Sequence, residues 1–572
     1  MRDVYARYRF SSYAGKALQW LADWHLAQGR PEAARACYAR MFREPDLQPA
    51  SVVRYALAAA ATGATAETKE TLGLLRGRMA NQTLLLAGQR VTGAAAAAQL
   101  EKELRPLPPP GERDWRSFGG PDATRAMPGR PTRTFSRRWA YTYPASLPRT
   151  QSSQRFSYYS STPRNRFSYL NFPVRHGNQV FIQTPRQFVS VDAATGAERW
   201  NQSDFVLTRE EMPADPQAPN SNYSSRASRT FQAAPVLSGR RVYARVPLAQ
   251  SEREVGRWPA DIAIAAYDAA TGAPIWRRLA LGDPRGTFYN LPLVQGGLVV
   301  SGSASLKGGI TEYSLVVLDA GTGEPLWTTY LGAGSDPLAY VDGSPPLLCD
   351  GVLWIETALY TLSAVDLISG EIRHIYRYPP SRQVGYGGRM DGGLLVANEP
   401  ISLIGAARGP IVFCPRWGQD AVAIDPGQGR LLWAAPKASR GSTVGVLIGL
   451  TERNAIICGD QVQALQLSDG QRQGIWEPEA GSGPVGVAAL CGDRICIPVD
   501  NKIHVVGADN LRPIEVLDFS RVLGEGPGFL TATMVGDLLL VAGADRVFAL
   551  GDAPSATVSR SAREWADRMQ GE

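Results

Sequence analysis

Five aspartates recur along the chain in the same local pattern, and they are the residues whose type and spacing could do chemistry. They are Asp192, Asp268, Asp319, Asp366 and Asp425. Carboxylates bind calcium and can act as general acids or bases. Each of these aspartates, however, is followed four residues later by a glycine, and in that place a carboxylate caps a tight turn. We interpret them as turn residues on separate repeats and predict no metal site and no catalytic residue among them.

The aspartates belong to a repeated segment that reads as a strand, a tight turn and a second strand ending in an aromatic residue. Its copies are SVDAATGAERW (190–200), AYDAATGAPIW (266–276), VLDAGTGEPLW (317–327), AVDLISGEIRH (364–374), AIDPGQGRLLW (423–433) and ALQLSDGQRQGIW (464–476). The glycines take the positive φ that reverses the chain, and they are Gly196, Gly272, Gly323, Gly370, Gly429 and Gly470. The closing aromatic residues are Trp200, Trp276, Trp327, Trp433 and the displaced Trp476, with His374 in the fourth copy.

A second hairpin, of the form apolar run, turn, apolar run, precedes these segments. It is found at 173–182, 235–244, 292–300, 346–355, 489–497 and 534–543. Two hairpins give four antiparallel strands, which is the blade of a β-propeller. A degenerate seventh copy lies near Ile514, and strand 546–551 lacks a following partner, so we expect Trp139 in 134–144 to complete an eighth blade from the other end of the domain.

The first hundred residues have helical spacing instead. Leu18, Leu21 and Trp24/His25 form one stripe, and Pro31 opens a second helix after Gly29-Arg30. Further helices are expected over 51–61 and 67–79. The first two helices resemble a single tetratricopeptide-type hairpin. The predicted domains are a helical segment (1–104), a proline-rich linker and lead-in (105–133), the propeller (134–552) and a C-terminal tail with room for a short helix (553–572).

Other reactive side chains do not form recognisable sites. The six cysteines include no C-x-x-C pair, so neither a disulfide framework nor a zinc site is predicted. The four histidines are His25, His176, His374 and His504, and each has a packing or turn explanation. Signatures of metalloproteases, phosphate-binding loops, serine hydrolases and EF-hands do not occur.

Composition and charge exclude little. The chain of 572 residues is 44% hydrophobic and 20% charged with a net charge of +7, values typical of a globular protein with a weak positive field. The arginine-aromatic stretch 150–167 reads as a polar loop, and we predict no nucleic-acid partner. No apolar run is long enough to span a membrane, and residues 1–10 do not read as a secretory signal. The long insertion 201–230 is the first candidate for partner contact.

The pattern A-x-D-x-x-T-G-x-x-x-W resembles the repeat of pyrroloquinoline-quinone (PQQ)-dependent dehydrogenases and of related non-enzymatic propellers, including the outer-membrane assembly lipoprotein. WRSFGG (115–120) is similar to the segment that opens such domains, and the resemblance covers about 115–550. It implies that the tryptophans dock between neighbouring blades. For a dehydrogenase it implies a disulfide between adjacent cysteines and a calcium held by glutamate, asparagine and aspartate, yet the sequence has no Cys-Cys pair.

The sequence thus predicts a mainly β protein, an eight-bladed propeller with a small N-terminal helical region. Because fold does not settle function, the hypothesis of a non-catalytic scaffold that binds a protein partner or ligand stands beside two alternatives. These are a quinoprotein oxidoreductase, which would use PQQ with calcium, and a polymer-binding or polymer-hydrolysing propeller. Under the leading hypothesis no cofactor is expected, and the resemblance implies the periplasm or cell envelope.

Overall fold

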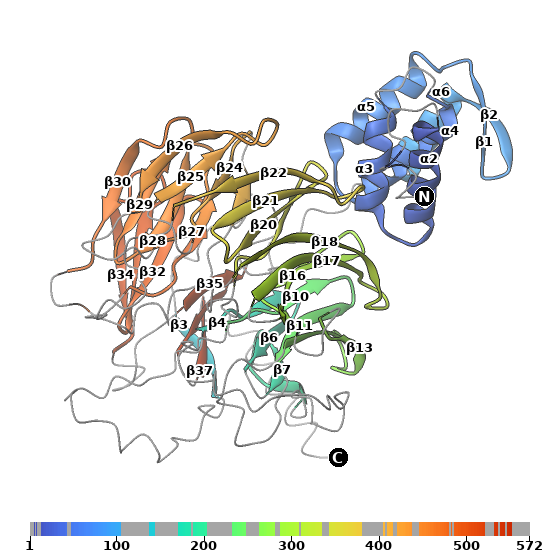
Figure 1. The fold of residues 1–572 in the computed structure, drawn as a ribbon. Helices are drawn as coiled ribbons and strands as arrows, with labels where there is room; N and C mark the ends of the chain where they lie inside the picture. Colours follow the sequence, from blue (N-terminus) through green and yellow to red (C-terminus); the bar gives the residue numbers. More distant parts are fainter. Residues whose placement is uncertain are drawn as a thin grey trace, which may run out of the picture.

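The computed structural model contains two regions, a group of helices and a ring of β-sheets (Figure 1). The structure describes residues 5, 7, 13–42, 47–104, 136–142, 170–184, 187–202, 232–247, 262–280, 286–307, 310–334, 343–379, 404–406, 409–415, 420–437, 445–479, 482, 485–520, 531–535, 538–543 and 546–551. The linker and lead-in, the stretch 150–167, nearly all of the insertion 201–230 and the tail 553–572 lie outside these residues. No helix in the described ranges is long and apolar enough to cross a membrane.

The N-terminal region is an array of antiparallel helices interrupted by one hairpin. Its elements are α2 (Ala14–Ala27), α3 (Pro31–Met41), α4 (Pro49–Ala61), α5 (Thr65–Arg76), β1 (Thr83–Leu86), β2 (Gln89–Thr92) and α6 (Gly93–Glu103). The predicted break at Gly29 is confirmed, because Gly29 has a φ of 69° and α3 begins with Pro31. The sequence interpretation missed the β1–β2 hairpin, whose turn places Ala87 and Gly88 at positive φ.

The remaining strands form eight antiparallel sheets, so the predicted eight-bladed propeller is confirmed. Blade one consists of β5 (Val174–His176), β6 (Gln179–Gln183), β7 (Phe188–Asp192) and β8 (Glu198–Gln202), and blade two of β10 (Val236–Ser238), β11 (Arg241–Pro247), β12 (Ile262–Asp268) and β13 (Pro274–Arg278). Blade three consists of β14 (Thr287–Phe288), β15 (Leu293–Gln295), β16 (Leu298–Lys307), β17 (Ile310–Asp319) and β18 (Pro325–Gly334). Blade four consists of β19 (Leu347–Cys349), β20 (Val352–Thr357), β21 (Thr361–Asp366) and β22 (Ile372–Arg377).

Blades five to seven are β23 (Ile404–Ala406), β24 (Ile411–Phe413), β25 (Asp420–Ile424) and β26 (Leu431–Pro436); β27 (Gly445–Leu450), β28 (Asn454–Gly459), β29 (Val462–Gln466) and β30 (Arg472–Trp476); and β31 (Ala489–Cys491), β32 (Arg494–Val499), β33 (Lys502–Gly507) and β34 (Pro513–Asp518). A short parallel pair, β4 (Leu170–Asn171) with β9 (Gln232–Ala233), links residues before blades one and two.

The eighth blade closes the ring with strands from both ends of the domain, as the sequence predicts. It consists of β35 (Thr531–Val535), β36 (Leu538–Ala542), β37 (Arg546–Gly551) and β3 (Ser136–Thr142), and β3 pairs with β37 so that Trp139 lies opposite Ala549. In Figure 1 the blue-green β3 lies beside the red strand β37. The closure leaves no open edge between the first and last blades.

Neighbouring blades are joined by one recurring contact, an aromatic ring that covers the turn glycine of the next blade. The turn in question joins the third and fourth strands of blades one to six, and we call it the Asp-Gly turn. Indole N–H groups donate to the carbonyl that follows the turn's first residue: Trp139 to Ala193 (2.9 Å), Trp200 to Ala269 (3.0 Å), Trp276 to Ala320 (3.0 Å) and Trp433 to Leu467 (2.8 Å). A Cβ on Gly196 would lie 2.7 Å from the Trp139 ring, so this glycine is required for space as well as for its φ of 74°.

Two further copies keep the arrangement with variations. His374 replaces the tryptophan at its register position opposite Ala364, and a Cβ on Gly429 would come within 2.4 Å of its ring. Trp327 stands opposite Val317 in the same register and packs in the cluster that contains Leu367 of the next turn.

Between blades six and seven the contact is reversed. Gly474, not Trp476, stands opposite Ala464 in the docking register, so Trp476 packs against blade seven from a position two residues further along its strand than the other tryptophans. In the facing turn Leu511 takes the glycine's place, with a φ of 55° and its N–H donating to the Gly507 carbonyl at 2.9 Å. The buried Leu511 side chain lies 3.5 Å from where a Gly474 Cβ would be, so here a leucine on the turn fills the space that a ring fills elsewhere. Trp476 is buried two residues further on, with its ring centroid 5.1 Å from that of His504.

This exchange predicts coupling between the two positions. Gly474→Trp alone should destabilise the propeller, because its side chain collides with Leu511 and the Asn510 carbonyl. Leu511→Gly alone should cost about 2 to 4 kcal/mol through lost packing, partly offset by relief of the positive φ. The double variant restores the ring-on-glycine arrangement, and we expect a coupling free energy of about 1 to 3 kcal/mol from urea unfolding. Strictly additive effects would contradict the interpretation.

Candidate protein interface

Each repeat aspartate uses one carboxylate oxygen to cap the turn that it begins. One carboxylate oxygen accepts hydrogen bonds inside the turn: Asp192 Oδ1 accepts from the N–H groups of Ala194 and Thr195, both at 3.0 Å, and from the Thr195 hydroxyl at 3.1 Å. Asp268, Asp319, Asp366 and Asp425 also accept from backbone N–H groups two or three residues further on. The N–H of Thr271 holds the pKa of Asp268 below its usual value, and the N–H of Gln428 does the same for Asp425.

The second carboxylate oxygen, Oδ2, points away from the turn and binds arginine in three of the blades. In blade one it binds Arg199 of the same blade at 2.6 Å. In blade four Asp366 Oδ2 pairs with Arg373, the equivalent residue, and also with Arg40 of helix α3. In blade three Asp319 Oδ2 accepts from both Nε and one terminal nitrogen of Arg30, each at 2.8 Å. In these three blades the Asp-Gly turn is therefore a carboxylate receptor for a guanidinium group as well as a fold element.

Helix α3 uses two of these receptors to attach the helical region to the propeller. Arg30 precedes the helix and Arg40 lies in its last turn, and they reach the adjacent blades three and four. The Arg30 and Asp319 side chains are only 7% and 12% exposed. Burial raises the pKa of Asp319, but the hydrogen bonds from Arg30 and Thr322 and the Arg30 charge together outweigh this, and the pKa is lowered. Since both groups are largely removed from water, losing one partner leaves a costly buried charge.

Close backbone approach completes this contact, which we call the junction. The turn between β15 and β16 consists of Gly296 and Gly297. A Cβ on Gly296 would lie 2.3 Å from Glu32 Cγ, and a Cβ on Gly297 would lie 2.6 Å from the Gly29 carbonyl oxygen. Gln295 donates its side-chain N–H to Glu32 Oε1 at 2.9 Å. Apolar contacts cross the junction too, because Ala33 packs in the core cluster of blades three and four and Ile368 packs in that of the helices.

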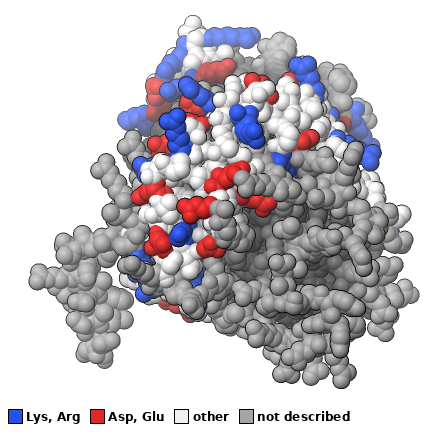
Figure 2. Space-filling view, turned by 90° about the vertical axis from the view of Figure 1, so that its left-hand side faces the viewer, with Lys and Arg blue, Asp and Glu red and all other residues white. Residues whose placement is uncertain are grey.

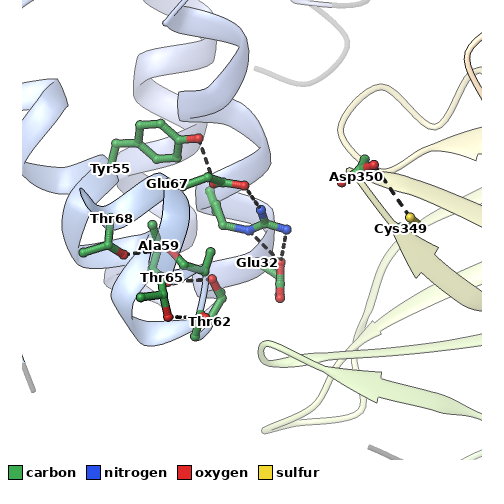
Figure 3. A network of polar contacts seen from close by, with 12 residues as sticks. Glu32, Tyr55, Ala59, Thr62, Thr65, Glu67, Thr68, Cys349 and Asp350 are labelled. Atoms are coloured by element: carbon green, nitrogen blue, oxygen red, sulfur yellow. Dashed lines mark hydrogen bonds and ion pairs between the residues drawn. The ribbon is translucent and has the colours of Figure 1, made fainter. Parts of the chain in front are cut away.

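The helices that carry the junction are tied to one another by a polar network (Figure 3). Arg35 of α3 donates to Glu32 Oε2 at 3.1 Å and to Glu67 Oε1 of α5 at 2.6 Å, and the Tyr55 hydroxyl of α4 donates to Glu67 Oε2 at 2.8 Å. Cys349 and Asp350 of blade four lie across from this network in the same view. Three helices therefore hold the Glu32 carboxylate that reaches the propeller.

The sequence interpretation did not find the junction. It assigned Asp319 and Asp366 correctly to their turns but gave no role to Arg30, Glu32, Arg40 or Gln295. The one sequence feature that could have indicated a close contact here is the Gly296-Gly297 pair. The turns of the other blade hairpins quoted from the sequence each contain a residue other than glycine. A double glycine allows another backbone to approach closely.

A second polar cluster lies buried between blades three and four. Glu356 accepts hydrogen bonds from the Tyr378 hydroxyl at 2.8 Å and the Ser344 hydroxyl at 3.1 Å, while the Tyr289 hydroxyl donates to the Glu356 carbonyl at 3.0 Å. Burial raises the pKa of Tyr378 well above its usual value, with the Glu356 charge adding to the effect. The hydroxyl donors satisfy this carboxylate inside the ring and join β20 to β22 and to the chain before β19.

The four histidines lie on separate elements, whereas the side chains of Cys491 and Cys496 are close enough to form a hydrogen bond. His25 is half-buried beside the junction, and burial together with the Arg30 charge lowers its pKa to about 4. His176 lies in β5 and His504 in β33. All six cysteines carry free thiols, and burial raises the pKa of Cys37 and Cys349 to about 12 and that of Cys458 to about 11. Across the ranges given above, no three His, Cys, Asp or Glu side chains gather as a metal site.

This donor set does not fit a calcium-bound quinone. The five repeat aspartates lie on separate blades and are engaged by turn N–H groups, three of them by arginines as well. Cys491 and Cys496 are diagonal neighbours on β31 and β32, since Cys496 pairs with Ala489 and Cys491 with Arg494. Diagonal pairs stand about 7 to 8 Å apart at Cα, too far for a disulfide.

Comparison with known proteins finds related propellers. Residues 260–509, from the second blade to the seventh, match the family model described as outer membrane protein assembly factor BamB. The solved structure of BamB from Moraxella catarrhalis is similar at 16% identity and a TM-score of 0.34, over 67% of this chain and 83% of that one. Quinohemoprotein alcohol dehydrogenases from Comamonas testosteroni (13% identity, TM-score 0.48, 77% of this chain and 81% of that chain) and Pseudomonas putida HK5 (12%, 0.49, 77% and 80%) are similar too. The curated proteins contain no match.

The junction predicts a local response to loss of its arginine pairs. In the variant Arg30→Ala/Arg40→Ala, we expect α3 and the Gly296-Gly297 turn to exchange amide hydrogens much faster. Loss of Arg30 leaves the buried Asp319 carboxylate without its arginine, at a cost of about 3 kcal/mol, and loss of Arg40 removes the link to blade four while Asp366 stays paired with Arg373. Hydrogen-exchange mass spectrometry would measure this. The matched control is Arg199→Ala, which removes the equivalent pair in blade one. Unchanged exchange in α3 would contradict the assignment.

The cysteine environments predict slow thiol chemistry in the folded protein. With pKa values of about 11 to 12 for three thiols, only a minute thiolate fraction exists at pH 8. We expect 5,5′-dithiobis(2-nitrobenzoate) to react slowly with the native chain and rapidly with all six thiols in guanidinium chloride. A single thiol that reacts rapidly in the native state would contradict this.

Proposed function

We propose that this chain, a β-propeller built of PQQ-like repeats, is a non-catalytic scaffold that binds a protein partner in the cell envelope. The observation that carries the proposal is the junction: this propeller already binds one helical element, and it does so with the carboxylates that its repeats supply. Two blades are used in this way. The Asp-Gly turns of blades two and five carry Asp268 and Asp425 in the same position.

The outer strands add apolar surface that supports protein binding. Exposed aliphatic side chains recur on the fourth strands of blades two, four, five, six and seven: Ile275, Ile375, Leu431, Leu432, Ile475, Ile514 and Val516. Apolar side chains next to unpaired strand edges are the parts of a propeller that another polypeptide can cover. Partner binding would remove this surface from water.

The charge pattern favours a protein over a polyanion. On the face in Figure 2, Lys and Arg side chains are interspersed with Asp and Glu, and acidic groups gather near the middle of the described surface. A continuous basic stripe is what phosphate backbones require. Mixed charges of this kind give orientation and specificity in protein complexes.

The location and the absence of a cofactor are parts of the same proposal. The family model that matches residues 260–509 is named for an outer-membrane assembly factor, and this supports the cell envelope as the place of action. The engaged repeat aspartates support a chain that works without PQQ and calcium.

A titration with PQQ, with and without calcium, separates the scaffold from a quinoprotein. We expect no saturable change in absorbance and no shift in melting temperature, because a ligand that binds only the folded state would raise it. Saturable, calcium-dependent binding together with reduction of an electron-accepting dye would overturn the proposal. The positive arm is affinity capture from envelope extracts, followed by calorimetry with each purified candidate. One partner with saturable binding is expected, and failure of every candidate to bind would count against the scaffold.

A further inference from the structure

Helix α2 presents an aromatic stripe to solvent. Tyr13, Trp20 and Trp24 are 67%, 50% and 37% exposed, and the two indole rings are nearly parallel, with an interplanar angle of 7° and centroids 6.3 Å apart. Large aromatic side chains normally contribute to a core or to a binding surface. The opposite face of α2 already fills the helical core with Ala17, Leu18 and Leu21. At one end of the stripe the Trp24 ring lies under the Arg30 guanidinium of the junction, with Cζ 4.8 Å from the ring centroid. Tyr13 and Trp20 are more exposed, so most of the outward stripe is additional to what folding requires.

The stripe follows one line along the helix. Its members Tyr13, Lys16, Trp20 and Trp24 are spaced by three or four residues, which places them on a single face. They extend about 16 Å along the helix axis. A surface of this length and width can lie flat against another surface without any rearrangement of the helix.

The charge of this face is positive. Lys16 is exposed and makes no ion pair within the described chain, and the stripe contains no carboxylate. The nearest acidic side chain on α2, Asp23, is engaged by Arg54 and by the Tyr38 hydroxyl of neighbouring helices. The face thus combines aromatic rings with one uncompensated lysine.

We propose that the α2 stripe docks on an anionic lipid surface. Trp and Tyr are the side chains that settle at the level of lipid headgroups, and basic residues near them are attracted to anionic lipids. A helix with such a face lies in the plane of the membrane interface without spanning it. This inference goes beyond the proposed scaffold function and does not depend on it.

The position of α2 gives such docking a consequence for the propeller. Figure 1 shows α2 and the β1–β2 hairpin on the side of the helical region that faces away from the propeller, while α3 lies toward it. Because α3 is attached to blades three and four by the junction, a membrane-bound α2 would hold the propeller beside the bilayer in one orientation. The membrane-facing element and the partner-binding ring would then be separate surfaces of one body.

Co-sedimentation of the full chain with vesicles tests the proposal. We expect binding to vesicles of phosphatidylglycerol and phosphatidylcholine at low salt and much weaker binding to phosphatidylcholine alone. Trp20→Ala/Trp24→Ala should lower the partition coefficient at least about tenfold, since it removes the apolar part of the contact. Lys16→Glu should weaken binding to the anionic vesicles only.

The matched control is Leu431→Ala/Leu432→Ala, which removes two similarly exposed apolar side chains from β26 and should leave vesicle binding unchanged. Circular dichroism verifies that each variant is folded. Absence of wild-type binding to anionic vesicles, or equal binding by the tryptophan variant, would overturn the proposal. Self-association that the tryptophan variant abolishes, without vesicle binding, would instead assign the stripe to a second copy of the chain. Partner capture uses separate reagents, so the two proposals fail independently.

Discussion

The contact between a tryptophan ring and the turn glycine of the next blade is the constraint on which the propeller depends. Each ring buries apolar surface, donates one hydrogen bond and fixes the spacing of two neighbouring sheets at once. The position requires glycine for two reasons: its backbone is left-handed, and a Cβ would collide with the indole ring. Where one side of the contact changes, the other changes with it: Gly474 faces Leu511, so the pair keeps its volume while the large residue moves to the other blade.

The same turns also explain how a fold element becomes a binding site. A carboxylate has two oxygens, and the turn uses only Oδ1 for its own N–H groups. Oδ2 is left for a guanidinium, either from within the blade, as with Arg199, or from another element, as with Arg30. Because the turns repeat around one face of the ring, the propeller carries the same receptor in several blades. The chain's own helical region shows this receptor in use.

Much of the fold could be predicted from the sequence, because the same residue types recur at the same spacing and an assignment made for one copy can be checked against the other copies. The blade count, the closing strand with Trp139 and the turn role of the aspartates were all predictable from that regularity. The junction was not, since it joins residues nearly three hundred positions apart and no local pattern marks Arg30 as a partner of Asp319. The sequence also did not predict that Gly474 occupies the docking register. The tryptophan at 476 indicated a copy with its ring displaced by two residues, whereas in the structure the glycine lies on β30 and the large side chain, Leu511, lies on the facing turn. The β1–β2 hairpin lies outside the repeats and offered only one Ala-Gly turn as a signal.

The irregular seventh copy has a physical reason in the way the ring closes. In blade eight the third and fourth strands, β37 and β3, come from opposite ends of the domain, so no Asp-Gly turn joins them. Blade seven has no such turn to cover, and its docking position, opposite Val505, is occupied by Glu515 rather than by an aromatic residue. The N-terminal part is thus fastened to the ring at two separate places. Its covalent continuation enters blade eight through β3, whereas its helices contact blades three and four through α3. The contacts of the junction, namely the arginine-carboxylate pairs, the close approach at Gly296-Gly297 and the apolar packing of Ala33 and Ile368, therefore hold the described helices against blades three and four.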